Sequence, residues 1–305
     1  MKKILCICLS STIQRTITFE NLSLENVNRS KHYRQDASGK AVNSARVLTQ
    51  LKKGSAITLC PLGKENEETF KKLAQKDGLE LLCTPIPGYT RECWTLLDSS
   101  RHTTTELVVS EPLPQKNEME KIAKAEIKLL KLMNENLCNF DAILLAGSKP
   151  SFWSEDLYPT IAGIAKDAKK LFLADFIGND LQKTLNNAVP DIIKINAEEF
   201  LSTFSLSLDT KEESLKETII KKSMEYNNIF VITRGNKSTY AAEKGSFFEF
   251  PSEIVEAVNT TACGDSFNAG FLYEYINSKD IFSALKMGTW CAARNAESEV
   301  PGSII

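Results

Sequence analysis

The chain has 305 residues, of which 42% are hydrophobic and 25% are charged, so it can bury a large α/β core with or without a small appendage. Its 37 basic and 39 acidic residues nearly balance, which excludes the strongly basic surface typical of a nucleic-acid-binding protein or of a protein bound to an anionic membrane. We therefore expect a small-molecule ligand, and neither a nucleic-acid partner nor a membrane partner.

The N-terminal stretch, MKKILCICLSS, combines two lysines with an apolar run. The run is only about seven residues long and no small-residue cleavage site follows it, so it predicts a buried strand rather than a secretory signal. Four cysteines, Cys6, Cys8, Cys60 and Cys83, lie inside apolar runs, and no two cysteines form a CxxC pair. This pattern is typical of buried, reduced thiols and predicts a cytoplasmic protein.

Short apolar runs alternate with longer amphipathic stretches along the chain. The runs predict buried strands within residues 3–9, 55–63, 79–88, 142–148, 171–176, 192–196 and 229–235. The amphipathic stretches predict helices near residues 40–52, 65–77, 116–137, 155–169, 211–226, 263–277 and 281–297. This alternation predicts a doubly wound parallel sheet between two layers of helices, with ligands at the carboxyl ends of the strands.

Two polar segments, residues 12–36 and 90–109, interrupt that alternation and are rich in Thr, Tyr and Arg. We expect them to form a small half-exposed sheet within one domain that spans residues 1–305. Such an appendage can act as a lid that excludes water from a transfer reaction, although an ordinary surface hairpin fits the pattern too. Its exposed edges favour pairing between subunits, which indicates a possible homodimer.

Two stretches, SGKAVN (38–43) and RGNKST (234–239), contain only part of a P-loop, and the GxGxxG pattern of dinucleotide-binding proteins is absent. Glycine-bearing turns at 146–150, 233–235 and 260–265 remain, and together they can line one cleft. The last turn leads into a helix, where free amides and the helix dipole favour a phosphate. Asp265 lies in that turn, where its negative charge would repel a bound phosphate. An Asp suits this position if its role is to take a proton from the group that attacks the phosphate.

The segment NAEE (196–199) follows a predicted strand. If the turn is helical, Asn196 and Glu199 face the same way, and they would suit Mg²⁺ held largely through water. The alternative is an ordinary helix cap followed by acidic residues in the first turn.

The segment VNTTACGDSFNAGFL (258–272) resembles the second signature of the PfkB family of ribokinase-like carbohydrate kinases, N-T-x-G-A-G-D-x-F. Four further matches follow the family order: ASGKAVNSARVL (37–48) resembles A-G-G-K-G-x-N-x-A-R-x-L, AGSKP (146–150) resembles S-G-S-L-P, KINAEE (194–199) resembles K-P-N-x-x-E, and ITRG (232–235) resembles a strand-end S-x-G. The resemblance implies a ribokinase-like α/β/α fold with a small lid sheet and ATP- and Mg²⁺-dependent phosphorylation of a sugar hydroxyl.

Within the family, the short stretches VNR (27–29), GYTR (88–91) and TTEL (104–107) are similar to elements of the phosphosugar branch. That branch contains 1-phosphofructokinase and tagatose-6-phosphate kinase, so the expected substrate is a ketohexose phosphate.

The resemblance and the chemistry of the turns together imply a role for each motif residue. Asp265 would be the general base, and the amides of Ala262, Cys263 and Gly264 would form the anion hole. The expected contacts with ATP are Lys194, Asn196, Thr233, Gly235 and Asn295, and those with Mg²⁺ are Asn196 and Glu199. The expected contacts with the sugar are Gln14, Gly39, Lys40, Asn43 and Ser148. Arg91, with Arg29 and Lys40, would bind the phosphate that the sugar carries. The alternatives are a helix N-cap for Asp265, a polar residue on a helix face for Asn43, and ordinary surface cations for Arg29 and Arg91.

The chain departs from the family pattern at three places. Gln14 stands where the family has a sugar-binding Asp, and the early glycine pair is Ser38-Gly39, with Ala41 in place of a further glycine. Ala262 and Cys263 replace a Gly-Ala pair at a point where the backbone would favour a positive φ. These changes leave two other functions open: a weakened sensor of sugar phosphate or nucleotide, and a kinase for an unphosphorylated sugar or a nucleoside.

Overall fold

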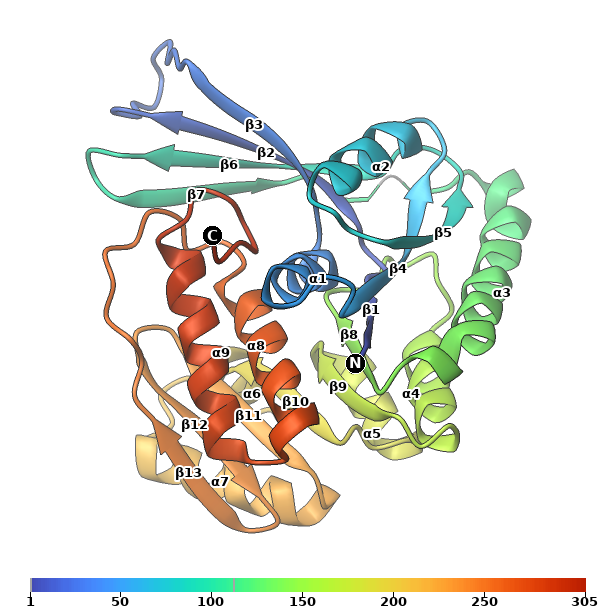
Figure 1. Ribbon diagram of the computed structural model, residues 1–305, viewed down its shortest axis with the longest axis vertical. Coiled ribbons are helices and arrows are strands. Elements are labelled where there is room, and N and C mark those ends of the chain that lie inside the picture. The colour runs from blue at the N-terminus through green and yellow to red at the C-terminus, as the bar shows by residue number, and fades with distance from the viewer. Residues whose placement is uncertain (1, 112) are drawn as a thin grey trace.

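The computed structural model describes residues 2–111 and 113–305, and its largest feature is a nine-stranded sheet (Figure 1). The strand order is β13-β12-β11-β10-β9-β8-β1-β4-β5. Seven strands fall one in each predicted apolar run and are parallel: β1 (Ile4–Ile7), β4 (Ala56–Gly63), β5 (Leu81–Ile86), β8 (Ala142–Ala146), β9 (Leu171–Asp175), β10 (Ile192–Asn196) and β11 (Ile229–Arg234). The predicted parallel sheet is confirmed.

An antiparallel hairpin, β12 (Lys237–Glu243) and β13 (Ser246–Phe250), extends the sheet beyond β11 and was not predicted. Its strands mix polar and apolar residues, so neither gives the continuous apolar run of a strand buried on both faces. The turn between them holds Lys244 and Gly245 at positive φ, which suits the twist of a two-residue hairpin.

In the part of the chain that the structure describes, nine α-helices cover the two faces of this sheet. Seven match the predicted helices: α1 (Lys40–Leu51), α2 (Glu67–Lys76), α3 (Met119–Asn136), α4 (Leu157–Asp167), α7 (Glu212–Tyr226), α8 (Cys263–Ser278) and α9 (Ile281–Ala296). Among the described residues, α5 (Gly178–Asn187) was not predicted, and α6 (Ala197–Thr203) was expected only as a helical turn at residues 196–199. The former is rich in Asn and the latter is very short, so neither has a long apolar stripe.

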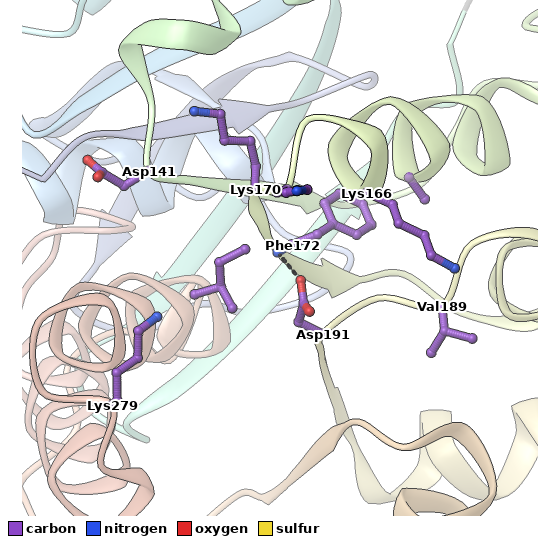
Figure 2. Close-up of a pocket in the computed structure, with 10 residues that line it drawn as sticks. Asp141, Lys166, Lys170, Phe172, Val189, Asp191 and Lys279 are labelled. Atoms are coloured by element: carbon purple, nitrogen blue, oxygen red, sulfur yellow. Dashed lines mark hydrogen bonds between the residues drawn. The ribbon is translucent and has the colours of Figure 1, made fainter.

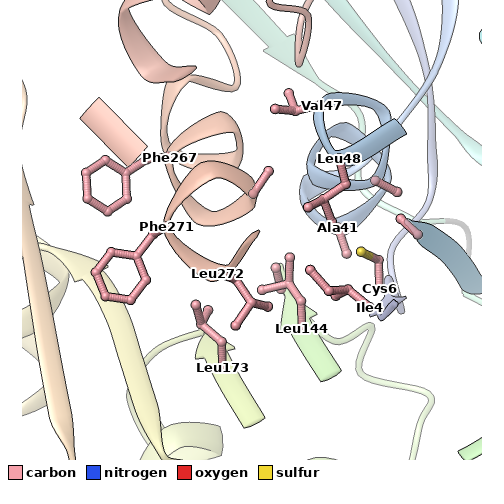
Figure 3. Packing of buried hydrophobic residues seen from close by; sticks show 14 of the residues in the cluster. Ile4, Cys6, Ala41, Val47, Leu48, Leu144, Leu173, Phe267, Phe271 and Leu272 are labelled. Atoms are coloured by element: carbon pink, nitrogen blue, oxygen red, sulfur yellow. The ribbon is translucent and has the colours of Figure 1, made fainter. Parts of the chain in front are cut away.

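Alternate residues of the central strand β1 point into two separate cores. Ile4 and Cys6 belong to the core beneath α1, α8 and α9, whereas Leu5 and Ile7 belong to the core beneath α3, α4 and α5. Figure 3 shows the first core, where the aromatic rings and Leu272 of α8 lie over the strand side chains. Each fully buried Leu, Ile or Phe contributes about 1.5–3 kcal/mol, so this face fixes α8 against the sheet.

A separate four-stranded sheet, here called the small sheet, projects from one end of the main sheet (Figure 1). Its order is β3-β2-β6-β7, formed by β2 (Thr12–Phe19), β3 (His32–Ser38), β6 (Arg91–Asp98) and β7 (Thr103–Val108). The predicted small sheet is therefore confirmed, and a turn over residues 99–102 joins β6 to β7. Asp98 closes that turn by accepting hydrogen bonds from the amides of Ser100 and Arg101.

The chain order of the parallel strands reverses between β1 and β8, which are neighbours in the sheet. In a doubly wound sheet the ligand crevice lies at such a switch point, outside the carboxyl ends of the strands. Within residues 2–111 and 113–305, no helix is both long and apolar enough to cross a lipid bilayer.

Candidate active site

The turn before α8 ends in a left-handed residue that aims the first helical amides outward. Ala262 has a φ of 65° and a ψ of 11°, and the helix begins at Cys263. The positive φ predicted for this position is confirmed. Among the described residues, the amides of Gly264 and Asp265 have no hydrogen-bond acceptor, and the Cys263 amide has only a long bond of 3.4 Å to the Thr260 carbonyl. The turn thus offers free donors at a helix N-terminus, the arrangement that binds anions.

Asp265 is in the first turn of α8 and is only 6% exposed. Because Ala262 is the N-cap residue, the alternative of Asp265 as the N-cap is wrong. Asn43 donates a hydrogen bond of 2.8 Å from Nδ2 to Oδ2 of Asp265. Burial raises the pKa of Asp265 to about 7, against the opposing effects of Lys40 and Asn43. A carboxyl group with that pKa is partly ionised near neutral pH, so it can accept a proton. It also binds that proton more strongly than an ordinary carboxyl group does.

The Asn43 side chain is held on both sides. Its Oδ1 accepts hydrogen bonds from Ser38 Oγ at 2.9 Å and from Arg46 Nη1 at 3.2 Å, which leaves Nδ2 for Asp265. Asn43 is a buried polar residue of α1, so it lies on an inward-facing side of that helix. The structure places Asn43 against the candidate base, and a direct contact with sugar stays a prediction.

A buried carboxylate that sequence reasoning missed, Asp175, ends β9 and joins three elements. Its oxygens lie 3.1 Å from Lys40 Nζ and 3.3 Å from Lys194 Nζ, and one accepts a hydrogen bond of 2.5 Å from Asn268 Nδ2. Burial alone would raise the pKa of Asp175, but Lys194 and Lys40 hold it well below its usual value. Lys194 Nζ is also 3.3 Å from the carbonyl oxygen of Gly264, so this cluster reaches the anion-binding turn. The only signal in the sequence was an acid at the carboxyl end of an apolar run.

Asn196 and Glu199 form a capping box at the start of α6. Asn196 Oδ1 accepts from the Glu199 amide, and Glu199 Oε2 accepts from the Asn196 amide, both at 2.8 Å. The helix-cap alternative is therefore confirmed as local structure. The second Glu199 oxygen is outside the box and lies 3.7 Å from Lys40 Nζ. The described residues contain no group of three His, Cys, Asp or Glu side chains able to hold a metal ion.

Two hollows adjoin this cluster at the carboxyl edge of the sheet. The first, here called the cationic hollow, has a volume of about 290 Å³ and is lined by Lys40, Arg91, Ser148 and Glu199 among others. It lies at the switch point, because its lining includes Ser10, which follows β1, and Gly147, which follows β8. Its position agrees with the predicted substrate site.

The second hollow, here called the apolar hollow, has a volume of about 570 Å³. Its apolar lining residues include Ile254, Val255, Phe267, Ala292, Ala293 and Ala296, and its polar or small ones include Thr233, Gly235, Asn236, Ser252, Glu253, Cys263 and Gly264. Burial raises the pKa of the Cys263 thiol to about 11, so the sulfur is neutral at pH 7 and adds no negative charge beside the free amides. The arrangement offers an apolar slot that leads to an anion-binding turn.

Several predicted contact residues line neither hollow among the described residues, and their direct roles stay predictions: Gln14, Arg29, Gly39, Asn43, Lys194, Asn196 and Asn295. Ala262 and Asp265 of the α8 turn do not line either hollow themselves. Gln14 is buried in the small sheet and donates a hydrogen bond of 2.6 Å to Thr95 Oγ1. Gly39 has a φ of 121°, and a Cβ there would lie 2.7 Å from Cys8 Sγ, so this position requires glycine for structural reasons. Asn295 is buried behind the turn, where it donates a hydrogen bond of 2.8 Å to the Thr261 carbonyl.

Arg29 also lines neither hollow among the described residues. It lies in the exposed connection between β2 and β3, at the end of the small sheet farthest from the main sheet (Figure 1). It has no hydrogen bond or ion pair with another described residue, as the surface-cation alternative expects. Arg91, in contrast, lines the cationic hollow and donates from Nε to Thr12 Oγ1 at 3.0 Å, so it is not an ordinary surface cation.

A third hollow, of about 450 Å³, lies at the opposite edge of the sheet (Figure 2). Its walls include Lys170, whose Nζ donates to the Phe140 carbonyl at 2.7 Å, and Asp191, which accepts from the Phe172 amide at 2.8 Å. These residues flank the amino ends of β8, β9 and β10, and none of them was predicted as a site residue. Because ligands of doubly wound sheets bind at the carboxyl ends, we do not assign the active site to this hollow.

Comparison with known proteins agrees with this geometry. The family model of the pfkB family carbohydrate kinases matches residues 1–303. Phosphofructokinase-2 from Escherichia coli in complex with fructose-6-phosphate is similar in fold, with a TM-score of 0.81, 14% identity and coverage of 97% of this chain and 94% of that chain. A possible 1-phosphofructokinase from Thermotoga maritima has a TM-score of 0.84 at 17% identity, with coverage of 98% and 93%. Ribokinase from Thermotoga maritima has a TM-score of 0.71 at 17% identity, with coverage of 100% and 96%.

Proposed function

Because the chain belongs to the pfkB family of carbohydrate kinases, we propose that it transfers the terminal phosphoryl group of ATP to a hydroxyl of a ketohexose phosphate. The reaction would be that of 1-phosphofructokinase, with that of tagatose-6-phosphate kinase as the nearest alternative. One observation carries the proposal: the carboxylate of Asp265 is buried in the same helix turn as free amides, and its neighbours Cys263 and Gly264 line the apolar hollow.

Asp265 would accept the proton of the attacking hydroxyl. In-line phosphoryl transfer depends on positioning and on charge stabilisation, and it becomes easier when the acceptor alcohol loses its proton in the transition state. With a pKa of about 7, roughly half of the Asp265 carboxyl groups are ionised at neutral pH. The amides of Gly264 and Cys263, with the α8 dipole behind them, would stabilise the charge that develops on the transferred group.

The apolar hollow would hold ATP. Its alanine and branched side chains suit a flat base, and its lining also includes Thr233, Gly235 and the first residues of α8, Cys263 and Gly264. Lys194, whose Nζ lies 3.3 Å from the Gly264 carbonyl oxygen, would contact the phosphates that approach the turn.

The cationic hollow would hold the sugar phosphate. Arg91 uses Nε for Thr12, and the structure gives its two Nη atoms no hydrogen bond to another described residue. Glu111 lies 3.4 Å from Nε of this guanidinium group. The terminal fork would therefore remain available to a phosphate, which it can bind with two parallel hydrogen bonds.

Mg²⁺ would be held by Glu199 and Asn196 through water. The donors fit that mode, because the capping box leaves one Glu199 oxygen free, and Mg²⁺ commonly keeps most of its waters in kinase sites. When bound, the ion neutralises charge on the phosphates of ATP. The second Glu199 oxygen lies 3.7 Å from Lys40 Nζ, so this carboxylate and this ammonium group adjoin the same part of the site.

The small sheet would close over the sugar phosphate, and its outer strand would pair two subunits. Strand β7 is an edge strand, and at its end Leu107, Val108 and Val109 are exposed apolar residues. An exposed apolar edge of this kind is a typical site of association.

A coupled assay of ADP formation tests the proposed function. We expect turnover with fructose 1-phosphate, fructose 6-phosphate or tagatose 6-phosphate, and little with fructose, ribose or nucleosides. Arg91→Ala should raise the KM for the phosphosugar by about tenfold or more while it leaves the KM for ATP within about twofold. A sensor would bind these compounds, seen as an increase in Tm, without forming ADP. An unchanged sugar KM in Arg91→Ala would favour a kinase of an unphosphorylated alcohol.

A further inference from the structure

A third cation, Lys149, lines the cationic hollow together with Arg91 and Lys40. Lys149 lies in the turn after β8, at the position where the family pattern S-G-S-L-P has an apolar leucine. Its side chain is only 7% exposed, and its ammonium lies 3.5 Å from Asp180 in the first turn of α5. A lysine side chain is rarely buried unless its charge is paired. A charged side chain in place of the leucine of the family pattern therefore requires an explanation.

The contacts of Lys149 leave most of its hydrogen-bonding capacity unused. An ammonium group has three donors, yet among the described residues Lys149 has one carboxylate within ion-pair distance and no hydrogen bond. Lys40 differs, because it donates a hydrogen bond of 3.1 Å to Asp175 and also lies near Glu199. A buried cation with free donors is costly unless a ligand supplies the missing acceptors.

The neighbouring walls hold Lys149 in place at the hollow. Tyr158 Oη donates a hydrogen bond of 2.7 Å to the carbonyl of Gly147, which fixes the turn that carries Lys149. The ring of Tyr158 packs on that of Phe176 with a centroid distance of 4.3 Å, and both rings line the hollow. The backbone and the walls around the ammonium are thus rigid, as precise recognition of an anion requires.

We propose that Lys149 binds the phosphate group that the sugar substrate already carries, beside Arg91, and that Asp180 positions its ammonium. This inference rests on the proposed function and adds a specificity residue to the same site. Each cation of the hollow has a carboxylate within ion-pair distance: Lys40 has Asp175, Arg91 has Glu111 at 3.4 Å, and Lys149 has Asp180. The two Nη atoms of Arg91 and the ammonium of Lys149 have no hydrogen bond to another described residue, so these donors remain available to the oxygens of a phosphate. A hollow with this pair would select a sugar phosphate over a free sugar.

The test compares Lys149→Met and Lys149→Arg with wild type in titrations of fructose 6-phosphate, fructose 1-phosphate, tagatose 6-phosphate, fructose and ADP. We expect Lys149→Met to weaken binding of the preferred hexose phosphate by about tenfold or more and to leave ADP binding within about twofold. Lys149→Arg, which keeps the charge, should bind within about threefold of wild type. In turnover, the KM for the hexose phosphate should rise while kcat changes little.

Lys183→Met is the matched control, because Lys183 lies on the same helix as Asp180 and pairs with Glu155 but does not line the hollow. It should bind hexose phosphates as wild type does. If wild type binds a hexose phosphate and Lys149→Met binds it equally well, the inference about Lys149 is overturned while the proposed function stands. Equal weakening of ADP and hexose phosphate would show a merely structural ion pair and would also overturn it. If wild type phosphorylates only uncharged alcohols, both proposals fail.

Discussion

Asn43 and Asp265 are 222 positions apart in the sequence, yet Asn43 Nδ2 donates a 2.8 Å hydrogen bond to the Asp265 carboxylate. The contact joins the first turn of α1 to the first turn of α8. Ser44 adds a second link, since its Oγ donates at 2.8 Å to the Asp265 carbonyl. Two motifs that lie far apart in the chain are thus fixed against each other at the candidate base.

Asn43→Ala should move the acid limb of the pH–activity profile to higher pH. The Asn43 hydrogen bond lowers the pKa of Asp265, so its loss raises that pKa further above about 7 and reduces the ionised fraction at neutral pH. We expect the limb of kcat/KM to shift upward by about one pH unit. Ser44→Ala is the control, because its hydroxyl contacts the backbone carbonyl and not the carboxylate. An unshifted limb in Asn43→Ala would show that this bond does not tune the base.

Ala262→Gly should stabilise the protein. Ala262 has a φ of 65°, and the left-handed conformation costs an L-residue about 1–2 kcal/mol, of which the greater flexibility of glycine in the unfolded chain cancels a part. We expect the free energy of unfolding, measured with urea at pH 7, to rise by about 0.5–1 kcal/mol. The kcat should not fall, because the free amides keep their place. A lower stability would mean that the Ala262 methyl group makes favourable contacts that outweigh the strain.

Asp175→Asn should strongly destabilise the protein, because it leaves Lys40 and Lys194 without their shared carboxylate. Removal of one partner from a buried ion pair costs about 3–5 kcal/mol. The control is Asp141→Asn, which breaks a partly exposed pair with Lys2 and should cost under about 1 kcal/mol. Equal losses in the two variants would show that the cluster is not a major source of stability.

The stability difference between wild type and Asp175→Asn should depend on pH, because folding lowers the pKa of Asp175. Asp175 has a lower pKa in the folded protein than in the unfolded chain, so it stabilises the fold above its usual value of 3.8. That contribution is lost as the pH falls below this value. The stability advantage of wild type over Asp175→Asn, measured with urea at a series of pH values, should therefore be constant near neutrality and shrink in acid.

The continuous apolar runs made the parallel strands predictable, because a strand buried on both faces needs such a run. The hairpin of β12 and β13 was missed because it lies at the sheet edge, where mixed polar faces are tolerated. Helix α5 was missed because its apolar residues are few and its Asn residues favour turns. The local sequence pattern thus predicted the parallel strands of the main sheet, but not the hairpin at its edge or helix α5.

For the site, the anion-binding turn was predictable because small residues that precede an apolar helix leave amides free. The cluster around Asp175 was not, since it depends on Lys40, Lys194 and Asn268 arriving from three separate elements. Lys149 was part of a recognised motif, but only its burial in the structure marks it as unusual. Contacts of this kind exist only after the chain has folded.

Asp265→Asn should also be more stable than wild type above neutral pH. The pKa of Asp265 is raised to about 7 from 3.8, so the folded protein binds a proton that the unfolded chain releases, and wild-type stability falls as the pH rises through this window. The amide of the variant has no such charge to bury. At pH 8, urea unfolding should show a gain of about 2 kcal/mol or more. Equal stability at pH 8 would mean that Asp265 has an ordinary pKa.

The most direct test is a single-turnover measurement of phosphoryl transfer by Asp265→Asn, with saturating ATP and hexose phosphate. We predict a loss of about 10²–10⁴ in rate, with the affinities for ADP and hexose phosphate unchanged, because only the proton acceptor is removed. Transfer at the wild-type rate by this variant would contradict the assignment of Asp265 as the general base, and with it the proposed mechanism.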